Sequence, residues 1–164
     1  MRLVAEKSGV STGMINHYFP NRMAMLEDTL VFVSRRFQAH AVAVIDAAEP
    51  GEPRLRALIQ ALLPTTPETI ETWNIWIAAY GASVRYAHLR SVIGERTQLW
   101  YDVLARTVEG LVPPDSELPI PFAWELDALI NGLVIQAIAT ESGLDLAKIE
   151  EAIVRAVKGA GASR

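Results

Sequence analysis

Residues 4–30 read VAEKSGVSTGMINHYFPNRMAMLEDTL, which predicts two short helices joined by a tight turn. Gly9 tolerates the positive φ of a helix exit, and the hydroxyl of Ser11 or Thr12 can accept a hydrogen bond from the first amides of the next helix. Pro20 ends that helix, because proline lacks the N–H that a helix interior uses. This spacing is typical of a helix-turn-helix, whose second helix enters the DNA major groove, although other tight helix pairs share the pattern.

The rest of the chain shows helical periodicity, and its proline and glycine residues fall between the periodic segments. Beyond Asn21, a second capping residue, apolar residues recur every three or four positions up to residue 48 and predict one long amphipathic helix. We therefore predict an all-α protein with a proline-rich loop over residues 113–121. Further helices are expected over residues 53–63, 68–82, 89–111, 122–142 and 145–158.

The 164 residues are 51% hydrophobic and 21% charged, which is enough apolar material for one globular domain or two small lobes. No cysteine occurs, so disulfides, thiolate metal sites and cysteine nucleophiles are excluded. The net charge of −4 argues against a uniformly basic protein that coats nucleic acid. Residues 1–40 carry five basic and three acidic groups, so a surface that binds a polyanion should lie at this end.

The first residues lack the long apolar segment of a secretory signal. The most membrane-like stretch, residues 120–139, contains Glu125, Asp127 and Asn131 and is too polar for a spanning helix of about 20 residues. We therefore expect a cytoplasmic protein without a membrane partner.

The sequence contains no HExxH, GxSxG, P-loop or GxGxxG motif. The three histidines, His17, His40 and His88, have no metal-ligand spacing. Glu125 and Asp127 are two residues apart on a helix and face different directions, so they make a poor acid–base pair. We expect neither enzymatic activity nor a metal or cofactor.

The sequence of residues 4–30 closely resembles the DNA-binding signature of the TetR (tetracycline-repressor) family of transcriptional regulators. The resemblance is carried by Val4-Ala5, Gly9-Val10-Ser11, the recognition segment 13–19, Arg22 and Leu26.

Within that family, Ser-Thr-Gly at 11–13 followed by His-Tyr-Phe at 17–19 is most similar to the branch of choline-sensing repressors of betaine synthesis. Trp73, Trp76 and residues 129–133 are similar to the C-terminal region of that branch.

The resemblance divides the chain into two domains. Residues 1–40 would form the helix-turn-helix DNA-binding domain and its linking helix, and residues 41–164 a helical ligand-binding and dimerisation bundle. Family members have a further helix before the position of Arg2, whereas this chain begins at the second helix. Either the given sequence starts late, or the DNA-binding unit is incomplete. In that truncated state Ile15 and Phe19 are expected to be partly uncovered.

The DNA contacts of the family transfer to this chain residue by residue. Asn16 falls where the family often places an aromatic contact, and its amide can read an adenine edge. His17 and Tyr18 match positions that clamp the phosphate backbone, and Arg22 matches the usual phosphate-binding lysine. Each residue also has an ordinary surface or packing interpretation. The predicted DNA-binding residues are Arg2, Ser11, Thr12, Gly13, Met14, Asn16, His17, Tyr18 and Arg22.

The resemblance also implies that a small molecule enters the C-terminal bundle and changes the separation of two recognition helices in a dimer. Trp73, Trp76 and Tyr80 recur along one helix face. Such a stripe can form an aromatic cage for a quaternary ammonium group, or it can be ordinary core. The candidate pocket residues are Trp73, Trp76, Tyr80, Tyr86, Trp100, Tyr101 and Trp124.

The helix expected over residues 122–142 is apolar around nearly its whole circumference, which one small core cannot bury. We therefore predict that a second copy of the chain covers part of it. Gly132 at mid-helix costs about 1 kcal/mol relative to Ala, which a close approach of another helix would explain, although Gly132 can also simply be tolerated. The candidate interface residues are Leu126, Leu129, Ile130, Leu133, Ala137 and Ile153.

Two functional hypotheses follow. The first is a ligand-responsive homodimeric repressor that binds an inverted-repeat operator, with half-sites about one helical turn (roughly 34–36 Å) or a multiple apart. The alternative is a helical dimer that binds a small molecule or a protein partner and has lost DNA binding.

Overall fold

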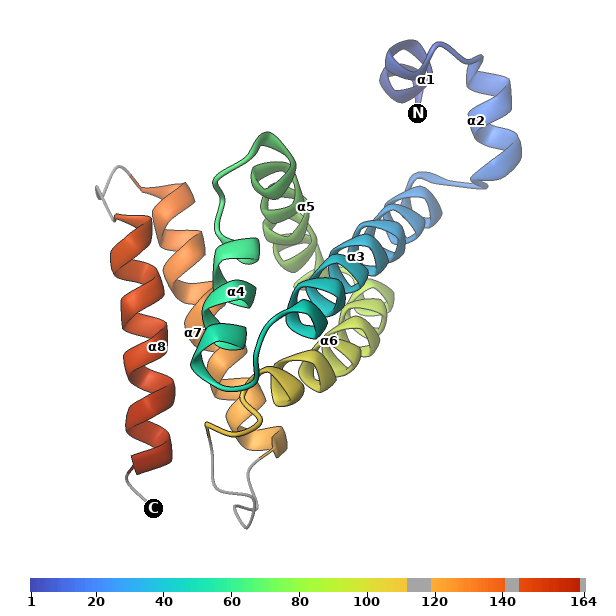
Figure 1. Ribbon diagram of the computed structural model, residues 1–164. Coiled ribbons are helices and arrows are strands. Elements are labelled where there is room, and N and C mark those ends of the chain that lie inside the picture. The colour runs from blue at the N-terminus through green and yellow to red at the C-terminus, as the bar shows by residue number, and fades with distance from the viewer. Residues whose placement is uncertain (112–118, 141–144, 163–164) are drawn as a thin grey trace.

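The computed structural model describes residues 1–111, 119–140 and 145–162, and within these ranges the chain forms eight helices (Figure 1). This confirms the predicted all-α fold. The helices are α1 (Arg2–Ser8), α2 (Thr12–Tyr18), α3 (Arg22–Ala47), α4 (Glu52–Leu62), α5 (Pro67–Ser83), α6 (Ala87–Thr107), α7 (Pro119–Ala139) and α8 (Leu146–Ala162).

The turn between α1 and α2 has the local geometry that its residues predict. Gly9 has a φ of 68°, in the left-handed region that a residue without a Cβ adopts at little cost. The Ser11 hydroxyl accepts a hydrogen bond from the N–H of Met14 at 3.1 Å and caps α2. The Asn21 side chain accepts one from the N–H of Ala24 at 2.9 Å and caps α3. These caps satisfy amides that have no partner inside their helices.

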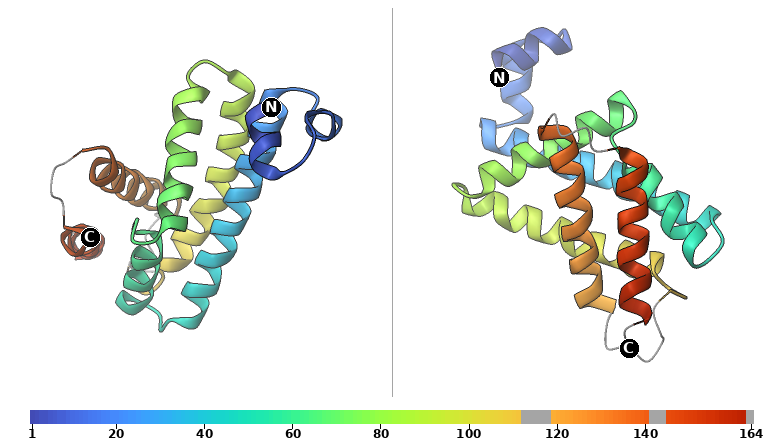
Figure 2. Two further views of the ribbon diagram at one scale, coloured as in Figure 1. Left: turned by 90° about the horizontal axis from the view of Figure 1, so that it is seen from above. Right: turned by 90° about the vertical axis from the view of Figure 1, so that its left-hand side faces the viewer.

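α3 joins two parts of the molecule. α1 and α2 lie beyond its N-terminal end and project from the body that the other helices form (Figures 1 and 2). Farther along, α3 contacts α4, α5 and α6, and its buried residues are Leu30, Ser34, Ala41 and Ile45. A movement of α3 within the body would therefore be passed directly to α1 and α2.

The main hydrophobic core lies between α3, α4, α6, α7 and α8, and Trp73 from α5 also contributes to it. A smaller cluster of Leu30, Leu89 and Ile93 joins the N-terminal halves of α3 and α6. Partly buried residues of α5, including Trp76 and Tyr80, pack against this second cluster. The bundle therefore has two apolar centres, and α5 contacts both.

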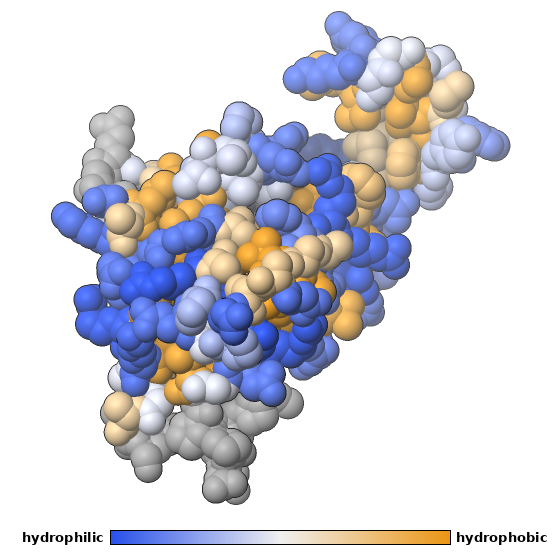
Figure 3. All heavy atoms as spheres, viewed as in Figure 1, coloured by the Kyte–Doolittle hydropathy of each residue, from blue (hydrophilic) through white to orange (hydrophobic). Residues whose placement is uncertain are grey.

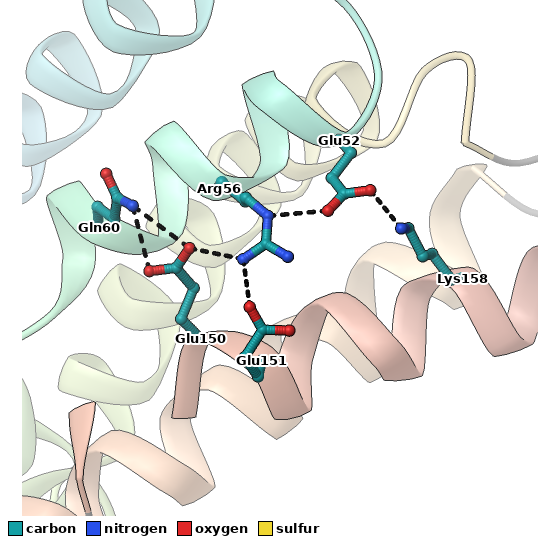
Figure 4. Close-up of polar contacts among 6 residues, drawn as sticks. All are labelled: Glu52, Arg56, Gln60, Glu150, Glu151 and Lys158. Carbon is teal, nitrogen blue, oxygen red and sulfur yellow. Dashed lines mark hydrogen bonds and ion pairs between the residues drawn. The ribbon is translucent and has the colours of Figure 1, made fainter. Parts of the chain in front are cut away.

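Polar contacts connect α4 to α8 on the outside of the bundle (Figure 4). The Arg56 guanidinium donates to Glu52 at 2.8 Å, to Glu150 at 2.9 Å and to Glu151 at 2.7 Å. Lys158 forms an ion pair with Glu52. One arginine thus bridges three carboxylates from two helices.

The predicted boundaries differ from the observed ones mainly around α7. The loop expected over residues 113–121 is wrong for its last three residues, because α7 begins at Pro119. Proline is tolerated in the first turn of a helix, where the N–H has no intrahelical partner. The earlier part of that loop, residues 113–118, and the expected helix end at residues 141–142 lie outside the described residues. α8 also continues four residues beyond its predicted end.

By length and composition alone, α7 is the one helix in the described part of the chain that could cross a membrane. The segment Phe122–Ala139 meets this criterion, and 28% of it is buried inside the protein. This is weak evidence for a membrane, because core helices pass the same test. The low burial shows that a single copy of the chain leaves much of this apolar helix uncovered.

Candidate DNA-binding helices and ligand pocket

All nine residues predicted to contact DNA are exposed, and six of them lie on α2. Ile15 points inward and is 8% exposed, whereas Tyr18 is 70% exposed. The His17 and Tyr18 rings contact each other edge to face, with their centroids 5.4 Å apart. The predicted residues that lie exposed on α1, α2, their turn and the start of α3 are Arg2, Ser11, Thr12, Gly13, Met14, Asn16, His17, Tyr18 and Arg22.

The expectation that Ile15 and Phe19 are partly uncovered is correct for Phe19 only, which is half-buried. It is wrong for Ile15, since α1 packs on α2 and its Ala5 is buried there. The exposed apolar residues of α1 are instead Leu3 and Val4, and apolar side chains are visible on the surface of this N-terminal part in Figure 3.

A cavity opens between α3, α5, α6 and α7 in the C-terminal bundle. It encloses an empty volume of about 610 Å³, counted with the solvent at its mouth. Its lining residues are Ser34, Phe37, Gln38, Leu62, Thr72, Trp73, Trp76, Tyr80, Arg96, Thr97, Trp100, Asp127, Ile130 and Asn131.

Aromatic rings form two pairs in the wall of this cavity. The rings of Phe37 and Trp100 lie 5.2 Å apart at an interplanar angle of 43°, and those of Trp76 and Tyr80 lie 5.8 Å apart at 34°. Trp73 is held in place because its indole N–H donates to the backbone carbonyl of Leu62 at 2.8 Å. The aromatic faces therefore come from three different helices.

Asp127 brings a carboxylate into this aromatic cavity. The indole N–H of Trp100 donates to its Oδ1 at 3.0 Å. Burial raises the pKa of Asp127 to about 6, and hydrogen bonds from the side chains of Trp100 and Asn131 oppose part of the rise. Burial and then the charge of Asp127 raise the pKa of Tyr80 to about 12, so this phenol stays neutral near pH 7. Asp127 is therefore a negative charge with few water neighbours at neutral pH.

Arg96 is the second charged residue of the cavity wall. Its Nε atom is buried, and no hydrogen-bond partner for it exists among the described residues. Thr97 also lines the cavity, and its side chain hydrogen-bonds to Tyr80. The cavity thus combines aromatic faces with one acidic and one basic group.

Four of the seven aromatic residues predicted to line a pocket lie in this cavity: Trp73, Trp76, Tyr80 and Trp100. The other three lie elsewhere: Tyr101 is half-buried outside the lining, and Tyr86 and Trp124 are exposed.

The sequence interpretation missed Asp127, Asn131, Arg96 and Thr97 as pocket residues. A signal existed for two of them, because Asp127 and Asn131 are polar residues four positions apart on a mostly apolar helix.

The predicted dimer residues fall into two groups. Leu126, Ile130 and Ile153 are buried in the protein's own core, where a second copy cannot reach them, so this part of the prediction is corrected. Leu129, Leu133 and Ala137 are half-buried and pack at the edge of that core. Because apolar residues lie around nearly the whole circumference of α7, the sequence alone could not distinguish its inner face from its outer face.

The outer face of α7 carries Trp124, Ala128, Gly132 and Gln136, which follow one another at four-residue steps and are all exposed. Trp124 is 58% exposed. A Cβ added at Gly132 meets nothing within 4 Å. This face therefore offers one large ring and a run of small residues to solvent.

Residues 51–161 match the family model of the BetI-type transcriptional repressor C-terminal domain. Among curated relatives, the HTH-type transcriptional regulator BetI of Agrobacterium fabrum is 28% identical over 88% of this chain and 69% of its own length. BetI of Burkholderia thailandensis is 31% identical over 79% of this chain and 66% of its own.

Solved structures with the same fold include a TetR-family transcriptional regulator from Rhodococcus, with a TM-score of 0.83 and 22% identity over 98% of this chain and 86% of that one. A transcriptional regulator from Saccharomonospora viridis, solved in complex with choline, has a TM-score of 0.80 and 23% identity over 94% of this chain and 82% of that one.

Proposed function

Since this chain belongs to the TetR family of transcriptional regulators and carries a BetI-type C-terminal domain, we propose that it is a cytoplasmic repressor that binds operator DNA as a homodimer and responds to a small organic cation. α1 and α2 supply the DNA contacts, the cavity between α3, α5, α6 and α7 binds the effector, and the outer face of α7 supplies the dimer surface.

The exposed residues of α2 support the DNA-binding part of this proposal. An amphipathic helix with one buried residue and an exposed opposite face can lie in a major groove about as wide as a helix with its side chains. Arg22 follows at the head of α3, where a cation can bind a phosphate beside the groove.

The single observation that supports a small organic cation as the effector is the Asp127 carboxylate inside an aromatic cavity. Ring faces attract a quaternary ammonium group by roughly 0.5–2 kcal/mol each, and such a group needs no hydrogen-bond acceptor. The carboxylate supplies the opposite charge. The choline bound to the Saccharomonospora viridis regulator is a ligand of this chemical class.

α3 can couple the two sites, because it supplies Ser34, Phe37 and Gln38 to the cavity and begins at Arg22 next to α2. A ligand shifts the balance between two arrangements of α3 only if it binds one of them more tightly. The uncovered outer face of α7 supports dimerisation, which would place two α2 helices on neighbouring major grooves.

Calorimetric titration with choline and with tetramethylammonium tests the effector class. We expect Asp127→Asn to weaken the binding of both cations at least tenfold, about the effect of losing one charge-assisted contact. Asp102→Asn, a matched change at an exposed position of α6, should leave it unchanged. A wild-type protein that binds neither cation would refute the proposed effector.

DNA binding is tested by titrating the protein onto the promoter DNA next to its reading frame, at several salt concentrations and with or without choline. We expect binding that weakens as salt rises, since phosphate contacts release counterions. A folded dimer that binds no DNA under these conditions would favour the alternative, a ligand- or partner-binding module.

A further inference from the structure

Arg96 places a positive charge and hydrogen-bond donors in the wall of the effector cavity, and a purely cationic ligand does not use them. We propose that the effector is a zwitterion, in which a carboxylate bound by Arg96 is joined to the ammonium group held by the aromatic rings and Asp127. This inference rests on the proposed function, because it places the effector in the same cavity.

The Arg96 side chain has unused hydrogen-bonding capacity at the cavity wall. It forms no hydrogen bond or ion pair with any described residue, and its Nε is shielded from solvent. A buried donor without a partner is costly, and most such groups in folded proteins are paired. The cavity is the space from which a ligand can supply the missing acceptor.

Arg54 provides a useful contrast within the same chain. Its Nε also has no partner in the described ranges, but its guanidinium donates to the carbonyl of Arg106 and forms an ion pair with Glu109. Glu27, which has one unsatisfied buried oxygen, is likewise engaged through its other oxygen with His88. Arg96 is the group in this set with no hydrogen-bond or ion-pair partner among the residues that the structure describes.

The two charges of the cavity are separate. Arg96 and Asp127 both line it, but they form no ion pair. Asp127 instead accepts its hydrogen bonds from Trp100 and Asn131. Arg96 lies four residues before Trp100, which is one turn away on the same face of α6. A ligand with its ammonium group near Trp100 and Asp127 can therefore extend its other end along α6 toward Arg96.

A carboxylate is the anion that fits best at this end. The planar guanidinium fork matches the two oxygens of a carboxylate, and a cation without an anionic group would only be repelled by Arg96.

The test compares three trimethylammonium ligands by calorimetry on the dimeric wild-type protein. Choline carries no carboxylate, whereas glycine betaine and 4-(trimethylammonio)butanoate carry one at a short and a longer distance. We expect at least one zwitterion to bind about ten- to hundredfold more tightly than choline. Arg96→Gln should abolish this preference and leave choline affinity equal or higher, and Arg96→Lys should retain part of it.

Arg35→Gln is the matched control, because Arg35 is exposed on α3 and outside the cavity. Thermal unfolding of each variant verifies that it remains folded. Choline binding as tight as that of both zwitterions, or an unchanged preference in Arg96→Gln, would overturn this inference alone. Binding of none of the three ligands would overturn the proposed effector site together with it.

Discussion

The indole N–H of Trp100 donates to the Asp127 carboxylate at 3.0 Å and connects α6 to α7 in the wall of the cavity. This bond connects an aromatic ring of the cavity wall to the acidic group of the cavity. It also opposes the rise of the Asp127 pKa, since it stabilises the ionised form. The aromatic face and the charge of the site are therefore one linked unit.

The affinity for a quaternary ammonium ion should fall in mild acid. Burial raises the pKa of Asp127 to about 6, so the carboxylate loses its charge as the pH falls through this value. Choline does not titrate in this range. We expect choline to bind about tenfold more weakly at about pH 5 than at about pH 7.5, measured by calorimetry.

Asp127→Asn should remove this pH dependence, which would assign it to this carboxylate. Trp100→Phe should move the pH midpoint upward, because it deletes a bond that favours the ionised carboxylate. A pH profile that is flat in the wild-type protein would contradict the role of Asp127.

The same carboxylate should destabilise the free protein at neutral pH. The folded pKa of Asp127, about 6, lies above the ordinary value of 3.8, so the folded state binds more protons between these values. The unfolding free energy should therefore fall as the pH rises from about 4 to 6, by about 2–3 kcal/mol. Asp127→Asn should be more stable than wild type by up to this amount at pH 7.5, and equally stable near pH 4. Urea unfolding at both pH values measures the difference, and Asp102→Asn serves as control.

The sequence correctly predicted the features that depend only on neighbouring residues. The caps at Ser11 and Asn21 and the left-handed Gly9 depend on a few neighbouring residues, and all three formed as expected. The aromatic stripe of α5 could be predicted as well, because Trp76 and Tyr80 share one helix face.

Other features depend on how distant helices cross, which the local sequence does not contain. Asp127 and Arg96 are separated by thirty residues, and they line one cavity only because α6 packs on α7. The inner face of α7 could not be distinguished from its outer face for the same reason, so Ile130 was assigned to a dimer surface although it is core.

Substitutions in α2 and at the head of α3 should separate affinity from sequence preference. Arg22→Ala should weaken binding to every DNA sequence and reduce the salt slope by about one, since it removes one phosphate contact. Asn16→Ala should mainly relax the preference for one base pair, with a cost of about 1–3 kcal/mol on the preferred site.

Arg35→Ala, which removes a charge from the exposed surface of α3, is the matched control. Fluorescence anisotropy with operator and scrambled DNA measures both properties. An Arg22→Ala protein with wild-type affinity for DNA would show that Arg22 does not bind a phosphate.

The Arg56 contacts should make the bundle sensitive to acid. Hydrogen bonds from Lys158 and then Arg56 lower the pKa of Glu52, and those from Arg56 lower that of Glu151. Carboxyls with lowered pKa values add stability that is complete above their ordinary value of 4.5 and lost as the pH falls through the folded value. We expect Arg56→Met to lower the thermal midpoint at pH 7 and to narrow its difference from wild type near pH 3. A difference that is the same at both pH values would mean that the methylene packing of Arg56, and not its charge, supports α4 on α8.

Gly132 can distinguish a free α7 face from a buried dimer surface. In a single chain the space around it is open, so Gly132→Ala should stabilise the helix by about 1 kcal/mol through propensity alone. If a second copy approaches the backbone there, a larger side chain must push the two helices apart. We expect Gly132→Leu to dissociate the dimer in light scattering, whereas Gly94→Leu, at another exposed helical glycine with open space around it, should not. The Gly132→Leu protein should keep its helical circular dichroism, because its monomer has room for the side chain. The same substitution should also weaken operator binding, because neighbouring half-sites need two linked α2 helices. A dimer that persists with leucine at position 132 would show that the interface does not lie at the centre of α7.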